Sequence, residues 1–292
     1  MKIKGVLPAL ITPFTPERMI DETGFRENIE YVVEHGVSGI VPCGTTGESA
    51  TLTSEEHEQL IDIAIDTSNV PVIAGTGSNN TADAVRFTCH AADAGADAAL
   101  LITPYYNKPN KNGIIAHFEA IASAADLPLI LYNIKSRTGI NLEPDLIAKL
   151  AEIPGVIGVK EASGDLGQVS RVIEMTRDMD FVVISGDDAL TLPIMSLGGV
   201  GVISVVANIA PAETVAFADA ILRSDYDEAR RHHYQLAPLV RTMFIETNPI
   251  PVKTAASMLG QSGGPLRLPL APMDAENEQK LHDALSAFGL ID

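Results

Sequence analysis

The sequence contains no tryptophan and only two cysteines, Cys43 and Cys89, among its 292 residues. Two cysteines cannot form a disulfide framework, and these two lack the spacing of a zinc site. No apolar run reaches the roughly 18 residues of a membrane-spanning helix. The apolar segment before Pro13 is too short for a secretory signal. We therefore expect a cytoplasmic protein without a membrane span or a metal site.

Basic residues are scarce, with 20 Lys and Arg against 38 Asp and Glu, which gives a net charge of −18. Such a surface repels nucleic-acid phosphates and anionic lipid headgroups, so neither nucleic acid nor membrane is an expected partner. The hydrophobic fraction of 46% and the charged fraction of 20% exclude a disordered or fibrous protein. A globular chain of this length has room for a large core.

Short apolar runs recur along the chain, and most are nearly continuous in Val, Ile, Leu and Ala, as expected for strands buried on both faces. The runs are residues 6–11, 39–41, 70–74, 98–102, 129–132, 156–160, 181–185 and 201–205. Amphipathic segments of helical length alternate with them, at residues 22–35, 53–66, 81–94, 112–125, 144–150, 166–176 and 189–197. Thr53 and Glu56 have the form of a capping box. Eight such units predict a (β/α)8 TIM barrel over residues 1–224.

The alternative is a doubly wound sheet, which typically stops at five or six units and has a phosphate loop after its first strand. Beyond residue 224, the segments 226–260 and 274–288 are predicted to be helical, with a proline-rich connector between them. We interpret residues 225–292 as a C-terminal helical extension packed on the barrel.

Catalytic groups of such barrels lie where the strands end. The corresponding segments here are GTTGES (44–49), TPYYNKP (103–109), YNIKSRTG (132–139), VKEASGD (159–165), SGDD (185–188) and ISVVAN (203–208). They contain lysines, tyrosines, threonines and an arginine, but no histidine cluster and no Ser-His-Asp set. Asp187 and Asp188 are sequence neighbours and are interpreted as a helix start. This composition favours imine chemistry over hydrolysis or metal catalysis.

Lys160 ends the apolar run GVIGVK. A lysine with an ordinary pKa near 10.4 is almost fully protonated at neutral pH, but burial lowers that pKa by about 3 or more. The neutral amine can then attack a carbonyl and form a Schiff base. The alternatives are a lysine that reaches solvent or pairs with Glu161. Lys135 is the rival nucleophile, in a polar segment where nothing is expected to lower its pKa.

Two further segments offer ligand-binding groups. Thr45 and Thr46 lie between two glycines directly after a predicted strand, where successive N–H groups and hydroxyls can hold an anion; a tight turn with a helix cap is the alternative. Tyr132 can exchange protons with a substrate, and Arg137 can bind a carboxylate with two hydrogen bonds. A structural tyrosine and a solvated arginine are the alternatives.

Together these segments resemble the dihydrodipicolinate synthase family, within the pyruvate-dependent class I aldolases. The resemblance runs from GVLPALITPF near the N-terminus to ETNPIPVK at residues 246–253. It implies a lyase without a cofactor that condenses pyruvate with L-aspartate 4-semialdehyde. The product is 4-hydroxy-tetrahydrodipicolinate, in lysine and diaminopimelate biosynthesis.

The resemblance also implies catalytic roles. Lys160 forms the imine with pyruvate, and Tyr132 is the acid/base that orders the substrate. Thr45 and Tyr106 complete a proton relay with Tyr132. The family is typically a homotetramer, a dimer of tight dimers, in which Tyr106 reaches into the neighbouring subunit's site.

The implied substrate-binding residues come from four segments. Thr46, with Thr45, holds the carboxylate of pyruvate, and Arg137 binds the carboxylate of aspartate semialdehyde. Gly186 and Ile203 border the site through main-chain atoms.

One position departs from the family pattern, because Lys135 stands where a proline is usual. A proline stiffens the loop that presents Arg137, so the substitution bears on the choice of second substrate. Sister aldolases that cleave N-acetylneuraminate or keto-deoxy-sugar acids are one alternative, although they typically lack the threonine pair together with the SRTG arginine. A catalytically inactive barrel that binds a keto acid is another.

Lysine-inhibited relatives bind lysine at the tight-dimer interface. The matching positions here are Ser49, Ala50, Ser54, His57, Asn79, Asn80, Asp83 and Tyr105. Ser54 replaces a usual histidine and Asp83 a usual glutamate. We therefore expect lysine to inhibit weakly or not at all.

Overall fold

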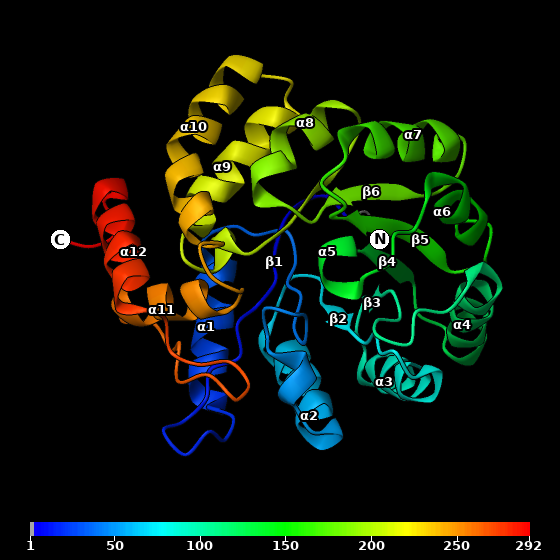
Figure 1. The fold of residues 1–292 in the computed structure, drawn as a ribbon, viewed down its shortest axis with the longest axis horizontal. Coiled ribbons are helices and arrows are strands. Elements are labelled where there is room, and N and C mark those ends of the chain that lie inside the picture. The colour runs from blue at the N-terminus through cyan, green and yellow to red at the C-terminus, as the bar shows by residue number, and fades with distance from the viewer. Residues whose placement is uncertain (1–2) are drawn as a thin grey trace.

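A computed structural model describes residues 3–292, and its centre is one curled sheet of seven parallel strands (Figure 1). The strands are β1 (Gly5–Pro8), β2 (Ile73–Gly75), β3 (Ala98–Ile102), β4 (Leu129–Asn133), β5 (Val156–Glu161), β6 (Val182–Ser185) and β7 (Gly201–Ser204). Their order in the sheet is β1-β7-β6-β5-β4-β3-β2. From β2 to β7 each strand pairs with the next in the chain, and the first strand pairs with the last. This order has no reversal, so it contradicts the doubly wound alternative.

The strand predicted at residues 39–41 is not a regular strand. Only Ile40 and Val41 take part, through isolated parallel bridges of Val41 with Ala9 and of Ile40 with Val72. Pro42 follows directly and has no N–H with which to continue the ladder. These bridges join residues 40 and 41 to segments adjoining the two edge strands of the sheet, β1 and β2.

The predicted helices that alternate with the strands are present. They are α1 (Glu22–Glu34), α2 (Ser54–Thr67), α3 (Thr81–Ala94), α4 (Lys111–Ala124), α6 (Pro144–Leu150), α7 (Leu166–Thr176) and α8 (Thr191–Ser196). A further helix, α9 (Pro211–Leu222), follows the last strand and was not among the predicted segments. The capping box of Thr53 and Glu56 begins α2, as predicted. Asp187 caps the short helix Asp188–Leu190 with its side chain, which confirms the predicted helix start. The segment after β4 also forms one short helix, α5 (Lys135–Thr138).

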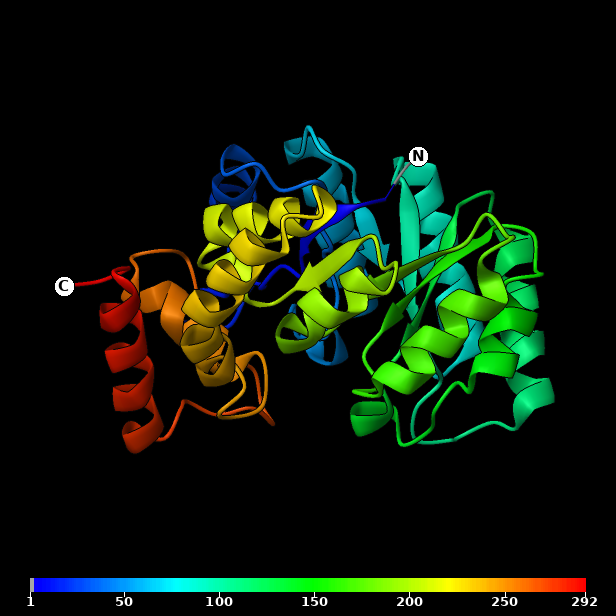
Figure 2. The same ribbon diagram turned by 90° about the horizontal axis from the view of Figure 1, so that it is seen from above.

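The segment 226–260, predicted to be helical, is not helical throughout. The structure has α10 (Tyr226–Thr242) and α11 (Ile250–Met258), separated by a loop. Pro249 and Pro251 lie at the N-cap and in the first turn of α11, where the missing N–H of proline costs no helical hydrogen bond, so they favour a helix start at this point. Pro238, by contrast, lies inside α10 without ending it. The last helix, α12 (Ala275–Phe288), matches its prediction. α11 and α12 lie at the side of the molecule away from strands β3 to β5 (Figures 1 and 2).

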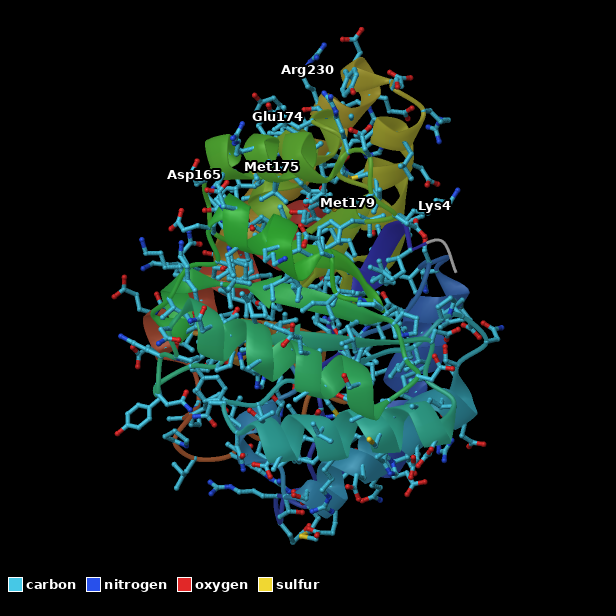
Figure 3. All side chains as sticks on the ribbon, turned by 90° about the vertical axis from the view of Figure 1, so that its right-hand side faces the viewer. Lys4, Asp165, Glu174, Met175, Met179 and Arg230 are labelled. Atoms are coloured by element: carbon cyan, nitrogen blue, oxygen red, sulfur yellow. The ribbon has the colours of Figure 1, made fainter. Side chains whose placement is uncertain are left out.

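Apolar side chains form two buried clusters, because successive residues of a strand face opposite sides of the sheet. The outer cluster fills the space between strands and helices and includes Val159. The inner cluster includes Leu7, Val41, Ile73, Leu100, Ile130, Tyr132, Ile184 and Ile203. Charged side chains such as Glu174 on α7 and Arg230 on α10 point outward (Figure 3). Within residues 3–292, each helix is too short or too polar to span a membrane.

Candidate active site

Lys160 and Tyr132 lie side by side on neighbouring strands. They are register partners in the pairing of β4 with β5. The Lys160 Nζ atom is 4.2 Å from the centroid of the Tyr132 ring. The two side chains are only 6% and 7% exposed. The predicted nucleophile and the predicted acid/base are therefore adjacent in a buried environment.

Burial lowers the pKa of Lys160 to about 7. The carboxylate of Asp188 opposes this shift and raises the pKa, while the positive charge of Arg137 lowers it further. A large fraction of the amine is therefore neutral at physiological pH, which is the form that attacks a carbonyl carbon.

Glu161, the neighbour proposed as an alternative partner of Lys160, faces the other side of β5. Its buried carboxylate accepts hydrogen bonds from the Ser163 N–H at 2.7 Å, from Asn133 Nδ2 at 3.1 Å and from Gln168 Nε2 at 3.3 Å. Asn133 and Glu161 are also register partners. This contact therefore ties β4 to β5 on the outer face, one residue beyond Tyr132 and Lys160.

The Tyr132 phenol is held in its protonated form. Burial raises the pKa of Tyr132 to about 12, although a hydrogen bond with the Thr45 side chain and the charge of Arg137 each lower it. The phenol is therefore a proton donor at neutral pH. Its contact with Thr45 brings two of the residues predicted for the proton relay together.

Asn248 connects two predicted binding residues and was missed in the sequence analysis. Its side-chain Nδ2 donates to the Thr46 Oγ1 at 3.0 Å, and its backbone carbonyl oxygen accepts from the Arg137 Nη2 at 3.0 Å. Thr46 is buried, whereas Arg137 is exposed on α5. Asn248 belongs to the quoted motif ETNPIPVK, so the signal was present but had no assigned role.

Gly186 packs against Lys160, the predicted nucleophile. A Cβ atom at this position would lie 3.0 Å from both Cγ and Cε of Lys160. Its N–H donates to the Glu161 carbonyl oxygen at 2.8 Å. The same Cβ would lie 2.9 Å from the Cβ atom of Ala162, so a larger residue here would displace the Lys160 side chain or this segment. Ile203, on β7, is fully buried in the same inner cluster as Tyr132.

Asp188 supplies the negative charge that faces Lys160. Its carboxylate accepts from Ser204 Oγ at 2.5 Å and from the Val205 N–H at 2.9 Å. Burial nevertheless raises the pKa of Asp188. Sequence reasoning treated Asp188 only as part of a helix start and missed this charge, because its partners lie on β7 and the loop that follows.

Within one chain, Tyr106 does not lie with Lys160, Tyr132 and Thr45. Its side chain is 90% exposed, and its backbone is in the left-handed region with φ of 67°. The preceding Tyr105 is half-buried. The structure of a single chain thus assembles Lys160, Tyr132 and Thr45, and leaves Tyr106 on the surface.

The positions matched to the lysine pocket of the relatives lie in two parts of the chain, residues 49–57 and residues 79–105. Asn79 Nδ2 donates to the Tyr105 carbonyl oxygen at 3.3 Å, and Asn80 Nδ2 donates to the Asp83 carboxylate at 2.9 Å. His57 is 4% exposed and stacks on Phe87, with its pKa lowered to about 4 by burial. The remaining members, from the short helix Ser49–Thr51 and the start of α2, are Ser49, Ala50 and Ser54.

Candidate metal ligands do not gather in the part of the chain that the structure describes. Residues 3–292 contain no group of three or more His, Cys, Asp or Glu side chains that could hold a metal ion.

Comparisons with known proteins place this geometry in a family. The model of the dihydrodipicolinate synthetase family matches residues 2–288. The chain belongs to this family. A 4-hydroxy-tetrahydrodipicolinate synthase of Methanothrix thermoacetophila is 59% identical, with 97% of this chain and 96% of that protein aligned.

Solved structures of the family agree with the fold. The crystal structure of dihydrodipicolinate synthase from Aquifex aeolicus has a TM-score of 0.96 at 45% identity, with 99% of each chain covered. The dihydrodipicolinate synthase from Acinetobacter baumannii, solved in complex with pyruvate, has a TM-score of 0.97 at 41% identity and covers 99% of this chain and 100% of that one. The family's fold therefore extends over nearly the whole chain.

Proposed function

We propose that the protein is a lyase that condenses pyruvate, bound as an imine of Lys160, with L-aspartate 4-semialdehyde. The product is 4-hydroxy-tetrahydrodipicolinate, in lysine and diaminopimelate biosynthesis. The observation that carries this proposal is the buried Lys160 amine, with a pKa of about 7, beside the Tyr132 phenol. The name of the Methanothrix relative supports the same activity.

The chemistry follows from a neutral amine in a buried site. The Lys160 nitrogen attacks the keto carbon of pyruvate, and water leaves as the imine forms. The protonated imine withdraws electrons, so a proton leaves the pyruvate methyl carbon and a nucleophilic enamine results. That carbon then attacks the aldehyde of the second substrate. The amino group of this substrate attacks the imine carbon, which closes the ring and releases Lys160 as the free amine. Tyr132 donates and accepts the protons of these steps, with Thr45 and Tyr106 as its partners in a relay.

The substrate contacts follow the same assignment. Thr46, with Thr45, holds the pyruvate carboxylate, and Arg137 binds the carboxylate of aspartate semialdehyde. Gly186 and Ile203 border the site through main-chain atoms. The hydrogen bonds of Asn248 to Thr46 and Arg137 support a common site for the two carboxylates.

The architecture behind this site is a closed (β/α)8 TIM barrel over residues 1–224 with a C-terminal helical extension over residues 225–292. The bridges of Ile40 and Val41 support closure, because they join segments beside both edges of the seven-stranded sheet. The packing of α10 against α9 and of α12 against α10 supports an extension attached to the barrel.

The assembly is a homotetramer, a dimer of tight dimers, that works in the cytoplasm without a cofactor. The 90% exposure of Tyr106 supports a partner chain over this side chain, because a large aromatic group is a costly surface residue. Cys43 and Cys89 are both free, as is usual for proteins of a reducing compartment.

A substrate screen tests the proposed function. Purified protein is incubated with pyruvate and aspartate semialdehyde, and in parallel with pyruvate and N-acetylmannosamine. We expect turnover only with the first pair. Turnover only with the second pair would assign the protein to the sugar-acid aldolases. Lys135, which replaces the proline usual in the family, would then be the first position to examine for the changed second substrate. Reduction of a pyruvate imine without turnover of either pair would indicate a binding protein.

A further inference from the structure

Lys253 is a second buried lysine, and it lies outside the reaction centre. Its Nζ donates to the Glu48 Oε1 at 2.6 Å and to the Pro265 carbonyl oxygen at 2.8 Å. The two charged side chains are 1% and 0% exposed. They are 205 positions apart in the chain, so this ion pair joins α11 to the segment that follows residue 44.

Arg267 completes the surroundings of Glu48. Its backbone N–H donates to the second carboxylate oxygen of Glu48 at 3.0 Å. Its guanidinium binds both oxygens of Glu56 at 2.5 and 2.6 Å and lies 4.1 Å from the centroid of the Phe14 ring. The Lys253 Nζ atom, the second cation at this ring, lies 4.5 Å from the centroid of Phe14. Both oxygens of Glu48 are therefore bound by residues from the C-terminal part of the chain.

Glu48 belongs to the loop that presents the two threonines of the proposed carboxylate site. Its backbone has a φ of 54°, a left-handed conformation that residues with a Cβ adopt rarely. Within the loop, the Glu48 N–H donates to the Thr45 carbonyl oxygen at 3.1 Å. The Gly47 carbonyl oxygen accepts from the Thr12 Oγ1 at 2.8 Å. Glu48 therefore takes part in the turn at Thr45 through its backbone and is anchored to the C-terminal segments through its carboxylate.

We propose that Lys253 is a positioning residue for pyruvate: its ion pair with Glu48 holds the 44–48 loop in the conformation that directs Thr45 and Thr46 at the substrate carboxylate. Lys253 itself does not touch the reacting atoms. This inference rests on the carboxylate role proposed for the two threonines. It assigns a function to α11 and the segment after it, which the reaction chemistry alone does not require.

The first experiment measures pyruvate binding without the second substrate. Protein is titrated with pyruvate in the presence of borohydride, and the concentration that gives half-maximal reduction of the imine is determined. Lys253→Met is expected to raise this concentration roughly tenfold or more, since a displaced loop would lose a threonine hydrogen bond to the charged carboxylate of pyruvate. The half-saturating concentration of aspartate semialdehyde in the full assay should stay within about twofold of the wild-type value.

A double variant separates positioning from stability. Lys253→Met alone leaves the Glu48 carboxylate buried without its cation, which destabilises the fold strongly. Glu48→Met combined with Lys253→Met replaces the pair by apolar side chains, a change that often restores stability. If the pair positions the loop, the double variant regains the melting temperature but keeps the raised half-saturation for pyruvate. If the double variant regained both the melting temperature and the wild-type half-saturation for pyruvate, the inference would be overturned, because the ion pair would then serve stability alone.

Leu285→Ala is the matched control. Leu285 is fully buried on α12, in the same C-terminal region, and belongs to the outer apolar cluster. This substitution should lower the melting temperature without changing the half-saturation for pyruvate. If Leu285→Ala raised the half-saturation for pyruvate as much as Lys253→Met does, the inference would be overturned. Any loosening of the C-terminal helices would then have the same effect.

Thr46→Val distinguishes failure of the inference from failure of the site assignment. A raised half-saturation in Thr46→Val together with a wild-type value in folded Lys253→Met would overturn the role of Lys253 alone. If Thr45→Val and Thr46→Val both kept the wild-type half-saturation for pyruvate, the proposed carboxylate site would be overturned, and the inference with it.

Discussion

The amine of Lys160 lies over the ring of Tyr132, with Nζ 4.2 Å from the ring centroid. The contact places a cation, when the amine is protonated, against an aromatic face, and the same contact excludes water from both groups. Asn133 and Glu161 secure the two strands one residue further on, on the outer face. The relative position of nucleophile and acid/base is thus set by a strand register that a buried polar contact maintains.

Borohydride reduction in the presence of pyruvate should add a reduced three-carbon group to Lys160. Its buried amine, with a pKa of about 7, is the reactive one, whereas Lys135 is exposed. Peptide mass mapping identifies the labelled residue. Lys160→Ala should fold, since it removes a buried amine, and should lose activity by about three orders of magnitude or more. Label on Lys135, or no label, would contradict this mechanism.

The rate of imine formation should rise with pH and level off above about pH 8. With a pKa of about 7, the neutral fraction of Lys160 rises from roughly a tenth at pH 6 to about half at pH 7 and nine tenths at pH 8. Tyr132, with a pKa of about 12, should add no falling limb below about pH 10. Stopped-flow measurement of imine formation checks the profile, and a rate independent of pH from 6 to 8 would refute it.

Lys160→Met should stabilise the fold most strongly at neutral and acidic pH. Because burial lowers the pKa of Lys160, the unfolded chain binds more protons between about pH 7 and 10.5. The penalty is fully present below the folded pKa, on the order of 4 kcal/mol, and fades as the pH rises towards the unfolded pKa. Denaturant unfolding at pH 7 and pH 10 checks this. A stability difference that does not shrink with pH would contradict it.

Subunits carrying Tyr106→Phe and subunits carrying Lys160→Ala should each be inactive alone but recover part of the activity when mixed. The Tyr106 side chain is 90% exposed in one chain, so we expect it to act in the site of a neighbouring subunit. In a hybrid, one site regains both groups. The control is each variant dissociated and re-associated alone. Hybrids that form but stay inactive would show that Tyr106 does not act across the interface.

Lysine should inhibit weakly or not at all. Ser54 offers no ring to pack on the ligand, and Asp83 is one methylene shorter than glutamate and is already hydrogen-bonded to Asn80. A lost charged hydrogen bond is worth about 1.5–3 kcal/mol, or roughly ten- to a hundred-fold in affinity. Titration of lysine into the coupled assay measures this. Half-inhibition below roughly 1 mM, which corresponds to about 4 kcal/mol of binding free energy, would refute the prediction.

Part of this protein was predictable from local sequence. The period of apolar residues identified the strands β3 to β7 and most helices to within a few residues, because strand and helix patterns depend on neighbours a few positions away. The same local signal, a lysine in an apolar run, identified Lys160. The periodicity did not reveal that residues 39–41 form only isolated bridges before Pro42, or that the segment 226–260 divides into two helices at Pro249 and Pro251.

Tertiary structure decided which side chains meet. Lys253 also lies in an apolar run, yet only the fold shows that it is buried against Glu48, 205 residues away, and not in the reaction centre. Asn248 reaches Thr46 for the same reason, across 202 residues. The 4.2 Å between Lys160 and Tyr132 likewise depends on strand register. Local sequence determined most of the elements and pointed to Lys160 as the candidate nucleophile. The contacts that surround Lys160 arise only when distant segments pack together, because burial and charge pairing are properties of the assembled core.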